Sequence, residues 1–545
     1  MVTKEKHKKT ENMKFKWVFF FLMIGLILAG CEREQEIELP EATVVIENYN
    51  GNAIVQEPAG EVELSIVSQS LAGIKKLEVL ANESVIETLE TEERFTHRYA
   101  YTYRVAKNAR TGDEVRLIFR MEDRRGRTVS SPAVIIRVDE PFRIVDFVRG
   151  GHTFRKIYGR INKDLTLTKK EKWLVDSIVS VDQGATLTIE PGTKVYFRTF
   201  SNSDKLSLLS VMRGGKIVAE GTRTEPIVFT SDKTLSGNPV RGDWGGVSIH
   251  GNAPTNAGKT VLRDGFRYGG THVSDNSGRL RFVRIEYAGK KQYHALQLFG
   301  VGSGTKLEYV QVFECHNNAF RMRGGRVSLK YISGIQHGGY GIWADEGWQG
   351  NGQFWLFQTG IKATLIPVNY WNQARSIEFR NDDSFYEKEP RTTFKLSNLT
   401  LIGNGYAEGG DHGTRRGIRI RTGAQGLLHN AIVTQFPSDA VRVEDFPIES
   451  LGSSMLIDNM RSYDNLANWE QEAKDYFFKS NRYNLKETPV GGISIDDFTG
   501  IEPSPYNPAA MSSWFTSASY IGAVDPKNDW TAGGSWFKNK DGSFR

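Results

Sequence analysis

The stretch LRFVRIEYAGKKQYHALQLFG (280–300) contains two short apolar units that recur along this chain. The first unit is leucine, any residue, Phe, Tyr or Asn, and then alternating apolar positions; it begins at Leu280, Leu307, Leu329, Leu396 and Leu428. The second unit follows a small residue and begins at Ala295, Ala319, Gly341, Ser376, Gly417 and Ala440. The two units alternate with a period of roughly 22 to 31 residues where no insertion intervenes.

This alternation predicts an all-β fold, a right-handed parallel β-helix. Each coil of such a solenoid gives one strand to each of several parallel sheets, and inward residues stack on their counterparts one coil away. A β-propeller would need antiparallel blades of about forty residues joined by hairpins, and no run of paired hairpins is visible. Asn398 and Asn430 share one repeat position, which predicts stacked asparagines.

Three consecutive segments carry a family resemblance: GATLTIEPGTKVYF (184–197), GGKIVAEGTRTEPIVFTS (214–231) and GDWGGVSIHGNAPTN (242–256). Together with SYIGAVDPKNDWTAGGSW (519–536) they resemble a large, mostly uncharacterised group of extracellular Bacteroidota proteins with a pectate-lyase-like β-helix. The resemblance covers nearly everything after Val181 and implies the fold and an exported location. Many relatives are acidic where this chain has CHNNAFRMRGG (315–325), so their cation sites are not carried over.

The chain begins with a predicted lipoprotein signal peptide, residues 1–30. Trp17 to Leu28 are almost wholly apolar after a lysine-rich start, and this run is too short for a hydrocarbon core of about 30 Å. Leu28-Ala29-Gly30-Cys31 resembles the bacterial lipobox, which implies that Cys31 is acylated and anchors the mature chain in the outer membrane. The alternative is an ordinary cleaved signal with a chance cysteine.

An acidic tether, residues 31–41, follows and contains EREQEIE. It resembles the export signals that send Bacteroidota lipoproteins to the cell surface; the alternative is a plain linker. The formal charge of +6 includes six lysines and two glutamates in the first thirty residues, so 6 − 4 leaves about +2 for the mature protein. That balance gives no reason to expect a nucleic-acid partner. Once Cys31 is lipidated, only Cys315 remains, so no intramolecular disulfide can form.

Residues 42–140 alternate as strands do and predict a small immunoglobulin-like β-sandwich. About seven short strands are separated by turn residues, including Ala72-Gly73, Thr111-Gly112-Asp113 and Arg125-Gly126. Nothing in this segment suggests chemistry, so we interpret it as a spacer. The β-helix is expected to occupy residues 141–545.

Two late stretches interrupt the repeat. A short amphipathic helix is predicted after a cap at Asp464 or Asn465, with its apolar face formed by Leu466, Trp469, Ala473, Tyr476 and Phe477. The last forty residues are aromatic and are expected to cap an open end of the β-helix, where core and strand edges would otherwise be exposed; they contain Trp514, Phe515, Tyr520, Trp530 and Trp536.

The second repeat unit places two columns of residues on the outside of the coils. One column contains Gln297, Arg321, Trp343, Glu378, Arg419 and Arg442, and its neighbour contains Phe299, Arg323, Asp345, Arg380, Arg421 and Glu444. With strands about 4.8 Å apart, six coils would form a strip of roughly 24 Å.

These arginine columns are our candidate for binding an acidic polysaccharide or other surface ligand, because guanidinium groups bind carboxylates bidentately and an indole can stack on a sugar. The glycan-binding candidates are Arg321, Arg323, Trp343, Arg380, Arg419, Arg421 and Arg442. The alternative is a ladder of arginine–carboxylate pairs that satisfy one another across the coils. The two columns contain six arginines and three carboxylates, which favours a surplus of arginines without a carboxylate partner.

Two further classes of function stay open, a structural adhesion protein without a defined ligand and a polysaccharide lyase or glycoside hydrolase. The resemblance to lyases of this fold implies a basic residue as catalytic base, for which His412 and Arg415 are candidates, with Asp345 as charge partner. No motif supports a cofactor or a metal: calcium could bind Asp382-Asp383 or Asp496-Asp497, but adjacent loop carboxylates are usually only solvated.

Overall fold

The computed structural model describes residues 40–109, 112–139, 142–202, 204–360, 375–405, 415–445, 450, 452–469 and 484–545. The predicted signal peptide, Cys31 and all of the predicted tether except residues 40–41 lie outside the described residues. The chain divides into two compact units. The first contains Glu61–Tyr103 and Val115–Ile136 together with the residues up to Ile54, and the second contains Arg137–Arg545 together with the short segments Val55–Gly60 and Arg104–Glu114.

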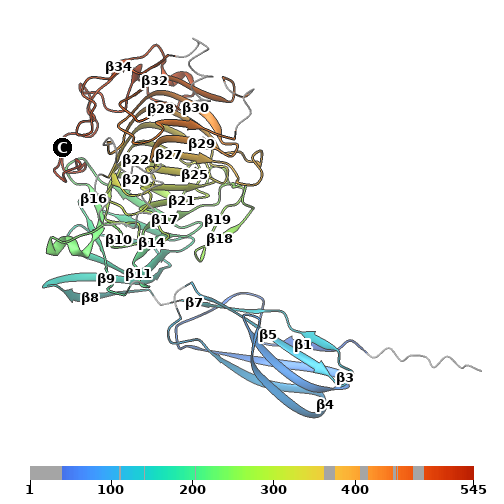
Figure 1. Ribbon diagram of the computed structural model, residues 1–545. Coiled ribbons are helices and arrows are strands. Elements are labelled where there is room, and N and C mark those ends of the chain that lie inside the picture. The colour runs from blue at the N-terminus through green and yellow to red at the C-terminus, as the bar shows by residue number, and fades with distance from the viewer. Residues whose placement is uncertain are drawn as a thin grey trace, which may run out of the picture. The chain divides into compact units, whose positions relative to one another are not determined.

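The N-terminal strands that the structure describes form a seven-stranded antiparallel sheet in the order β1-β3-β5-β7-β2, with β4 beside β3 and β6 beside β5 (Figure 1). The strands are β1 (Thr43–Ile46), β2 (Ile54–Gln56), β3 (Glu61–Ala81), β4 (Ser84–Arg104), β5 (Glu114–Asp123), β6 (Thr128–Ser130) and β7 (Val134–Val138). Alternate residues point inward, and Ile74, Val79, Leu117 and Phe119 are at most 1% exposed.

The prediction that all these strands are short is wrong, because β3 and β4 each have 21 residues. The expected turn at Ala72-Gly73 is a bend inside β3. Gly73 has a φ of 82°, and the pairing with β5 shifts register between Ile74 and Lys76. A glycine in the left-handed region lets a strand bend without ending it. The turn at Arg125-Gly126 is present, closed by the bond from Gly126 N to Asp123 O of 2.9 Å.

The second unit is a parallel β-helix, as the repeats predicted. It opens with an antiparallel hairpin, β8 (Arg143–Arg149) and β9 (His152–Ile161), and β9 pairs parallel to β11. Every later pair in the large sheet that the structure describes is parallel, and the coils stack as Figure 1 shows.

Three files of strands build the coils. Sheet 1 consists of β14 (Leu208–Val211), β17 (Gly246–His250), β21 (Leu296–Phe299), β23 (Phe320–Arg323), β25 (Ile342–Asp345), β27 (Arg375–Arg380), β29 (Arg416–Arg421) and β31 (Val441–Val443). Sheet 2 begins with β10 (Leu165–Leu167), β12 (Thr186–Ile189) and β15 (Lys216–Glu220), and sheet 3 begins with β11 (Trp173–Val181), β13 (Lys194–Phe197) and β16 (Ile227–Ser231). Each later strand bends, so that its first part lies in sheet 2 and its second part in sheet 3. These strands are β20 (Gly278–Glu286), β22 (Lys306–Phe313), β24 (Ser328–His337), β26 (Asn351–Thr359), β28 (Thr393–Ile402), β30 (Gln425–Thr434) and β32 (Met455–Tyr463).

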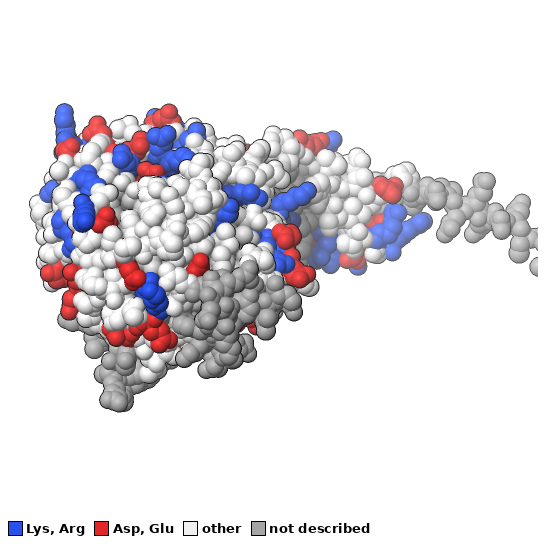
Figure 2. All heavy atoms as spheres, turned by 90° about the horizontal axis from the view of Figure 1, so that it is seen from above, with Lys and Arg blue, Asp and Glu red and all other residues white. Residues whose placement is uncertain are grey.

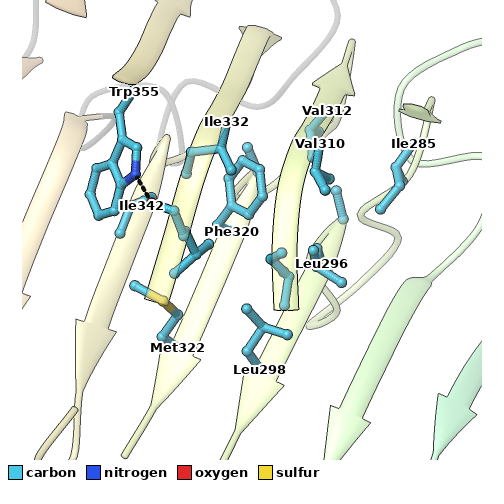
Figure 3. Close-up of a cluster of buried hydrophobic side chains, with 14 of the residues drawn as sticks. Ile285, Leu296, Leu298, Val310, Val312, Phe320, Met322, Ile332, Ile342 and Trp355 are labelled. Carbon is cyan, nitrogen blue, oxygen red and sulfur yellow. Dashed lines mark hydrogen bonds between the residues drawn. The ribbon is translucent and has the colours of Figure 1, made fainter. Parts of the chain in front are cut away.

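The predicted register is confirmed residue by residue. Leu280 pairs with Leu307 and Leu307 with Leu329, while Leu396 pairs with Leu428. A coil containing Gly352, which the leucine pattern missed, lies between Leu329 and Leu396. Inward residues of successive coils stack into one continuous core (Figure 3), and the Trp355 indole nitrogen inside it donates to Leu329 O at 2.9 Å.

The bend between sheets 2 and 3 falls at the Phe, Tyr or Asn position of the first repeat unit. All seven residues there have a positive φ between 48° and 61°: Phe282, Tyr309, Tyr331, Phe354, Asn398, Asn430 and Asn459. The first four rings stack with centroids 4.4 to 4.7 Å apart. Asn398 and Asn430 follow one another in the same file, as expected for stacked asparagines. Left-handed backbone suits asparagine but strains an aromatic residue, and ring stacking offsets that strain.

The C-terminal segment (484–545) begins at the last coil, where Leu485 and Lys486 pair with β32. Its aromatic last forty residues then run along the side of the coils, contrary to our expectation of an end cap. Its backbone accepts hydrogen bonds from side chains on many successive coils, among them Arg223, Arg284, Lys330 and Asn398. Trp530 and Trp536 pack with Phe282 and Phe354 in a second apolar cluster against the outer side of sheet 3. A solenoid flank covered by apolar residues has to be shielded along its whole length, which an end cap could not do. The segment includes β33 (Leu485–Lys486), β34 (Glu502–Pro503), β35 (Tyr520–Ile521) and a short 3₁₀ turn at Pro508–Ala510, while another, Asp232–Ser236, follows β16.

The predicted late helix does not start at its expected cap. Residues 464–469 are bends, and Ala467 instead forms a β-bridge with Asp439. Trp469 is buried at 5% exposure, whereas Leu466 is 60% exposed. Ala473, Tyr476 and Phe477 lie outside the described residues. Among the described residues no helix has the length and apolar character needed to span a membrane.

Candidate functional site

The two arginine columns exist as geometric files on the outer side of sheet 1. The strand register joins Gln297 to Arg321, Arg321 to Trp343, Trp343 to Glu378, Glu378 to Arg419 and Arg419 to Arg442. The neighbouring column joins Phe299 to Arg323, Arg323 to Asp345 and Arg380 to Arg421. Stacking therefore brings side chains that are more than 100 residues apart onto one face.

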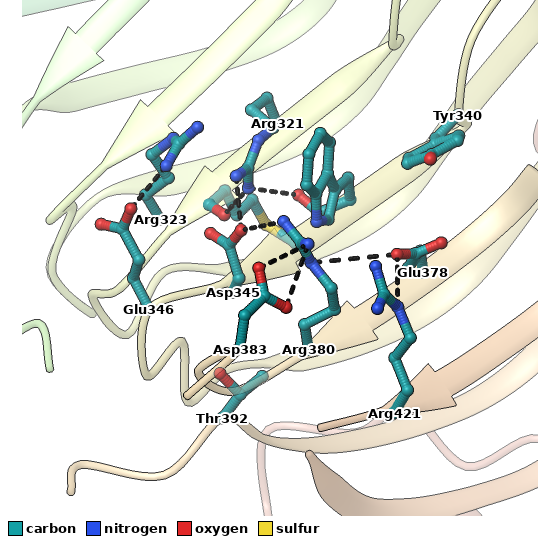
Figure 4. Close-up of polar contacts among 12 residues, drawn as sticks. Arg321, Arg323, Tyr340, Asp345, Glu346, Glu378, Arg380, Asp383, Thr392 and Arg421 are labelled. Carbon is teal, nitrogen blue, oxygen red and sulfur yellow. Dashed lines mark hydrogen bonds and ion pairs between the residues drawn. The ribbon is translucent and has the colours of Figure 1, made fainter. Parts of the chain in front are cut away.

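The first half of the columns is a buried ionic network. Arg321 is fully buried and donates to an Asp345 carboxylate oxygen at 2.6 Å and to Met322 O at 2.6 Å. Arg380 reaches the same Asp345 oxygen at 3.2 Å, and Arg323 pairs with Glu346 at 2.5 Å (Figure 4). Burial alone would raise the pKa of Asp345, but Arg321 and Arg323 outweigh it and hold the pKa well below its usual range. The group is therefore ionised and already paired.

The second half of the columns is paired too. Arg421 donates to Glu378 at 3.1 Å, Arg419 to Glu444 at 2.7 Å, and Arg442 pairs with both Glu444 and Asp439. Three carboxylates outside the columns also pair with arginines of the columns: Glu346, Asp383 and Asp439. The count within the columns did not include them. The predicted surplus is therefore wrong: each of the six arginines has a carboxylate partner, because loops contribute acids that the strand pattern does not contain.

Trp343 is not an open platform for a sugar. The guanidinium carbons of Arg321 and Arg380 lie 4.0 and 4.4 Å from the centre of its ring, and Tyr340 packs on it edge to face at 5.3 Å. Cations already occupy the positions over the indole that a sugar ring would need. Trp343 is part of the network and not a free binding surface.

The catalytic candidates that the structure describes, Arg415 and Asp345, do not form an accessible site. Arg415 is 9% exposed and Asp345 is held by two arginines, while His412 lies outside the described residues. A catalytic base has to be accessible and within reach of its substrate proton. The described residues contain no group of three or more metal-ligating side chains, and Cys315 is buried, with burial raising the pKa of its thiol to about 12.

A second row of charged side chains lies on the outer side of sheet 2. We call it the basic face and define it by Arg279, Arg281, Lys306, Glu308, Lys330 and Lys395. The register places Arg279 over Lys306 and Arg281 over Glu308, and Glu308 over Lys330; Lys395 follows two coils further on, over Asn351. The row spans five coils from β20 to β28, which is about 19 Å at about 4.8 Å per coil.

The basic face differs from the arginine columns in exposure and pairing. Arg281 and Lys306 are exposed and form no ion pair within the described part of the chain, and Arg279 is 59% exposed beside a single glutamate, Glu220, at 3.5 Å. Lys330 donates to Trp514 O at 2.8 Å and lies 4.5 Å from the centre of its partly exposed ring. The basic face therefore has five cations and one carboxylate, Glu308, with Glu220 on the preceding coil as a second carboxylate and the Trp514 ring beside Lys330.

Sequence reasoning missed the basic face although its signal was present. The leucine unit has an outward position directly after its leucine, occupied by Arg281, Glu308 and Lys330, and stacking this unit as we stacked the other would have revealed the row. In Figure 2, which shows the molecule from above, basic and acidic residues are interspersed around a largely uncharged centre.

The fold defines the class of protein: a parallel β-helix, here with elongated polar flanks. A model of the pectate-lyase-like β-helix domain matches residues 159–488, more than half of the chain, so the chain belongs to that family.

Other comparisons add resemblance only. None of the curated proteins compared with the chain matches it. Among solved structures, the fibronectin(III)-like modules of Clostridium thermocellum CbhA are similar at 19% identity over 18% of this chain and 94% of theirs, with a TM-score of 0.15. Pectate lyase Pel3 from Pectobacterium carotovorum is similar at 9% identity over 70% of this chain and 85% of its own, with a TM-score of 0.11.

Proposed function

We propose that this protein is a lipid-anchored cell-surface protein that binds a linear acidic polysaccharide along the basic face of its β-helix. The observation that carries the proposal is the excess of cations over carboxylates on this face, where Arg281 and Lys306 are exposed and form no ion pair in the described part of the chain. The charges of the arginine columns, by contrast, are used internally. A row of cations at the spacing of the coils suits a polymer with repeated carboxylate or sulfate groups. The membership in the pectate-lyase-like family supports polysaccharide as the ligand class.

The anchor rests on the lipobox around Cys31, and we expect the membrane to be the outer membrane. Several acyl chains on one terminus would give stable attachment, since a single chain binds only marginally. A Cys31→Ser variant should move the protein from the membrane fraction to the soluble fraction and abolish labelling by a fatty-acid analogue. Retention of the label would overturn acylation at Cys31.

Binding is tested first on an array of neutral, uronic and sulfated glycans, with the full chain purified in detergent. The double variant Arg281→Met, Lys306→Met removes two positive charges. It should weaken binding to the acidic polymers about tenfold or more, and its affinity should depend less on salt concentration. Lys259→Met is the matched control, because Lys259 is an exposed cation in the loop before β18 (Val261–Arg263) and β19 (Phe266–Tyr268) and is not on the basic face.

Equal affinity of the double variant and the control would contradict binding at the basic face. The same preparations also test the catalytic alternative, since a lyase releases unsaturated products from uronic-acid polymers. Release of such products would favour a lyase over a non-catalytic binding protein, and release of saturated oligosaccharides would favour a glycoside hydrolase. No binding to any glycan would leave structural adhesion as the better description.

A further inference from the structure

A separate cavity lies on the outer side of sheet 3, where the end of the C-terminal segment crosses the early coils. Its volume is about 420 Å³, within the range of small-molecule sites. Strands β13, β16 and β20 supply its floor, the turn after β16 supplies one wall, and Lys538 and Phe544 supply the other. None of these residues belongs to the arginine columns or to the basic face.

A buried carboxylate organises the floor of this cavity. Glu286 is 3% exposed and accepts hydrogen bonds from Arg284 Nε at 2.6 Å and from the Thr230 hydroxyl at 2.8 Å, and Lys538 Nζ lies 2.8 Å away. Burial alone would raise the pKa of Glu286, but Arg284 and Lys538 outweigh it and lower the pKa. Both carboxylate oxygens are engaged, so Glu286 positions two cations and does not itself offer a site to a ligand.

Several donors in the cavity have no partner within the described residues. Tyr196 is 6% exposed, and neither its hydroxyl group nor that of Tyr287 forms a hydrogen bond there. Arg284 uses Nε for Glu286 and Nη1 for the carbonyl oxygens of Ser535 and Trp536, and Nη2 has no such bond. Lys194 is exposed at the rim and forms no ion pair in this part of the chain. Polar groups in such a pocket usually have a hydrogen-bond partner, supplied by water or ligand.

The charge and shape of the cavity select the class of ligand. Three cations, Lys194, Arg284 and Lys538, face one carboxylate, which leaves a balance of +2. Tyrosine hydroxyls can donate to or accept from sugar hydroxyl groups, and Val228, Leu235 and Phe544 give the walls an apolar part. We propose that this cavity binds a single sugar acid, with its carboxylate near Arg284 and Lys194 and its hydroxyl groups on Tyr196 and Tyr287. This site is independent of polymer binding on the basic face.

The test is isothermal titration of the full chain in detergent with glucuronate, galacturonate, glucose and sodium sulfate. We expect a uronate to bind and glucose not to bind. Tyr196→Phe removes one hydroxyl group and Lys194→Met one charge at the rim, and each should weaken uronate binding about tenfold. Unchanged affinity in both variants would overturn the assignment. Sulfate binding as tight as uronate would also overturn it, because the cavity would then recognise an anion and not a sugar acid.

The double variant Arg281→Met, Lys306→Met separates the two proposals. It should bind the free uronate as the unmodified protein does while losing acidic polymer. Loss of uronate binding in this variant would contradict a separate cavity site. The tyrosine variant should keep its affinity for the polymer, and a loss of polymer binding there would mean that the cavity is part of one continuous polysaccharide site.

Discussion

The variant Arg321→Met tests whether the arginine columns stabilise the fold or bind a ligand. The side chain is fully buried, its ion pair with Asp345 is 2.6 Å long, and its guanidinium lies 4.0 Å from the Trp343 ring centre. Removing one partner of a buried pair typically costs about 3–5 kcal/mol, because a charge is left uncompensated. Arg380 still reaches Asp345 at 3.2 Å, so we expect the lower end, about 3 kcal/mol.

The assay is urea unfolding followed by tryptophan fluorescence, with the free energy of unfolding compared between variants. Arg281→Met is the matched control, since it removes an exposed arginine from the next sheet, and it should change that free energy by less than about 0.5 kcal/mol. Combining Arg321→Met with Asp345→Leu should recover part of the loss, because an apolar pair can replace a buried ion pair and Arg380 keeps Asp383 as a partner when Asp345 is removed.

A second readout separates structure from function. Folded Arg321→Met should bind acidic polysaccharide as the unmodified protein does. If the variant keeps its stability and loses binding, the columns contact the ligand and our reasoning from burial is refuted.

Three further predictions concern the buried residues Asp345, Asn398 and Cys315. The folded-state pKa of Asp345 lies below its unfolded value, so the stability it contributes is present above about pH 4 and should be lost as pH falls further; melting temperatures measured from pH 6 to 2 should fall less steeply in Asp345→Asn. Asn398→Ala places alanine at a φ of 58° and removes the hydrogen bonds to Ala518 O and Tyr520 O. It should lower the free energy of unfolding by about 2 kcal/mol and speed proteolytic release of the C-terminal segment. Asn398→Gly should speed that release too, but without the backbone strain. Cys315, with its raised pKa and no exposed surface, should react with a thiol reagent only after denaturation, and fast reaction of the native protein at Cys315 would contradict its burial.

Much of the fold could be predicted because the same short sequence pattern recurs in each coil of the β-helix. Each coil has to place apolar residues inward at the same positions, so Leu280, Leu307 and Leu329 mark the register without any knowledge of the rest. Gly352 broke the leucine pattern and hid one coil, because a neighbouring Trp355 ring fills the space that a leucine would occupy. The long bent strand β3 was misjudged because a glycine can mark either a turn or a bend.

The sequence alone therefore determined the solenoid, its register and the two arginine columns, since these follow from periodic side chains in successive coils. It did not determine which charges are free. Glu346, Asp383, Asp439 and the C-terminal segment come from loops and a tail with no period, and only folding brings them onto the coils. Pairing with a carboxylate of the same chain reduces the charge that a guanidinium can offer to a ligand. The tertiary structure pairs the arginines of the columns in this way, whereas Arg281 and Lys306 on the basic face are exposed and form no ion pair among the described residues.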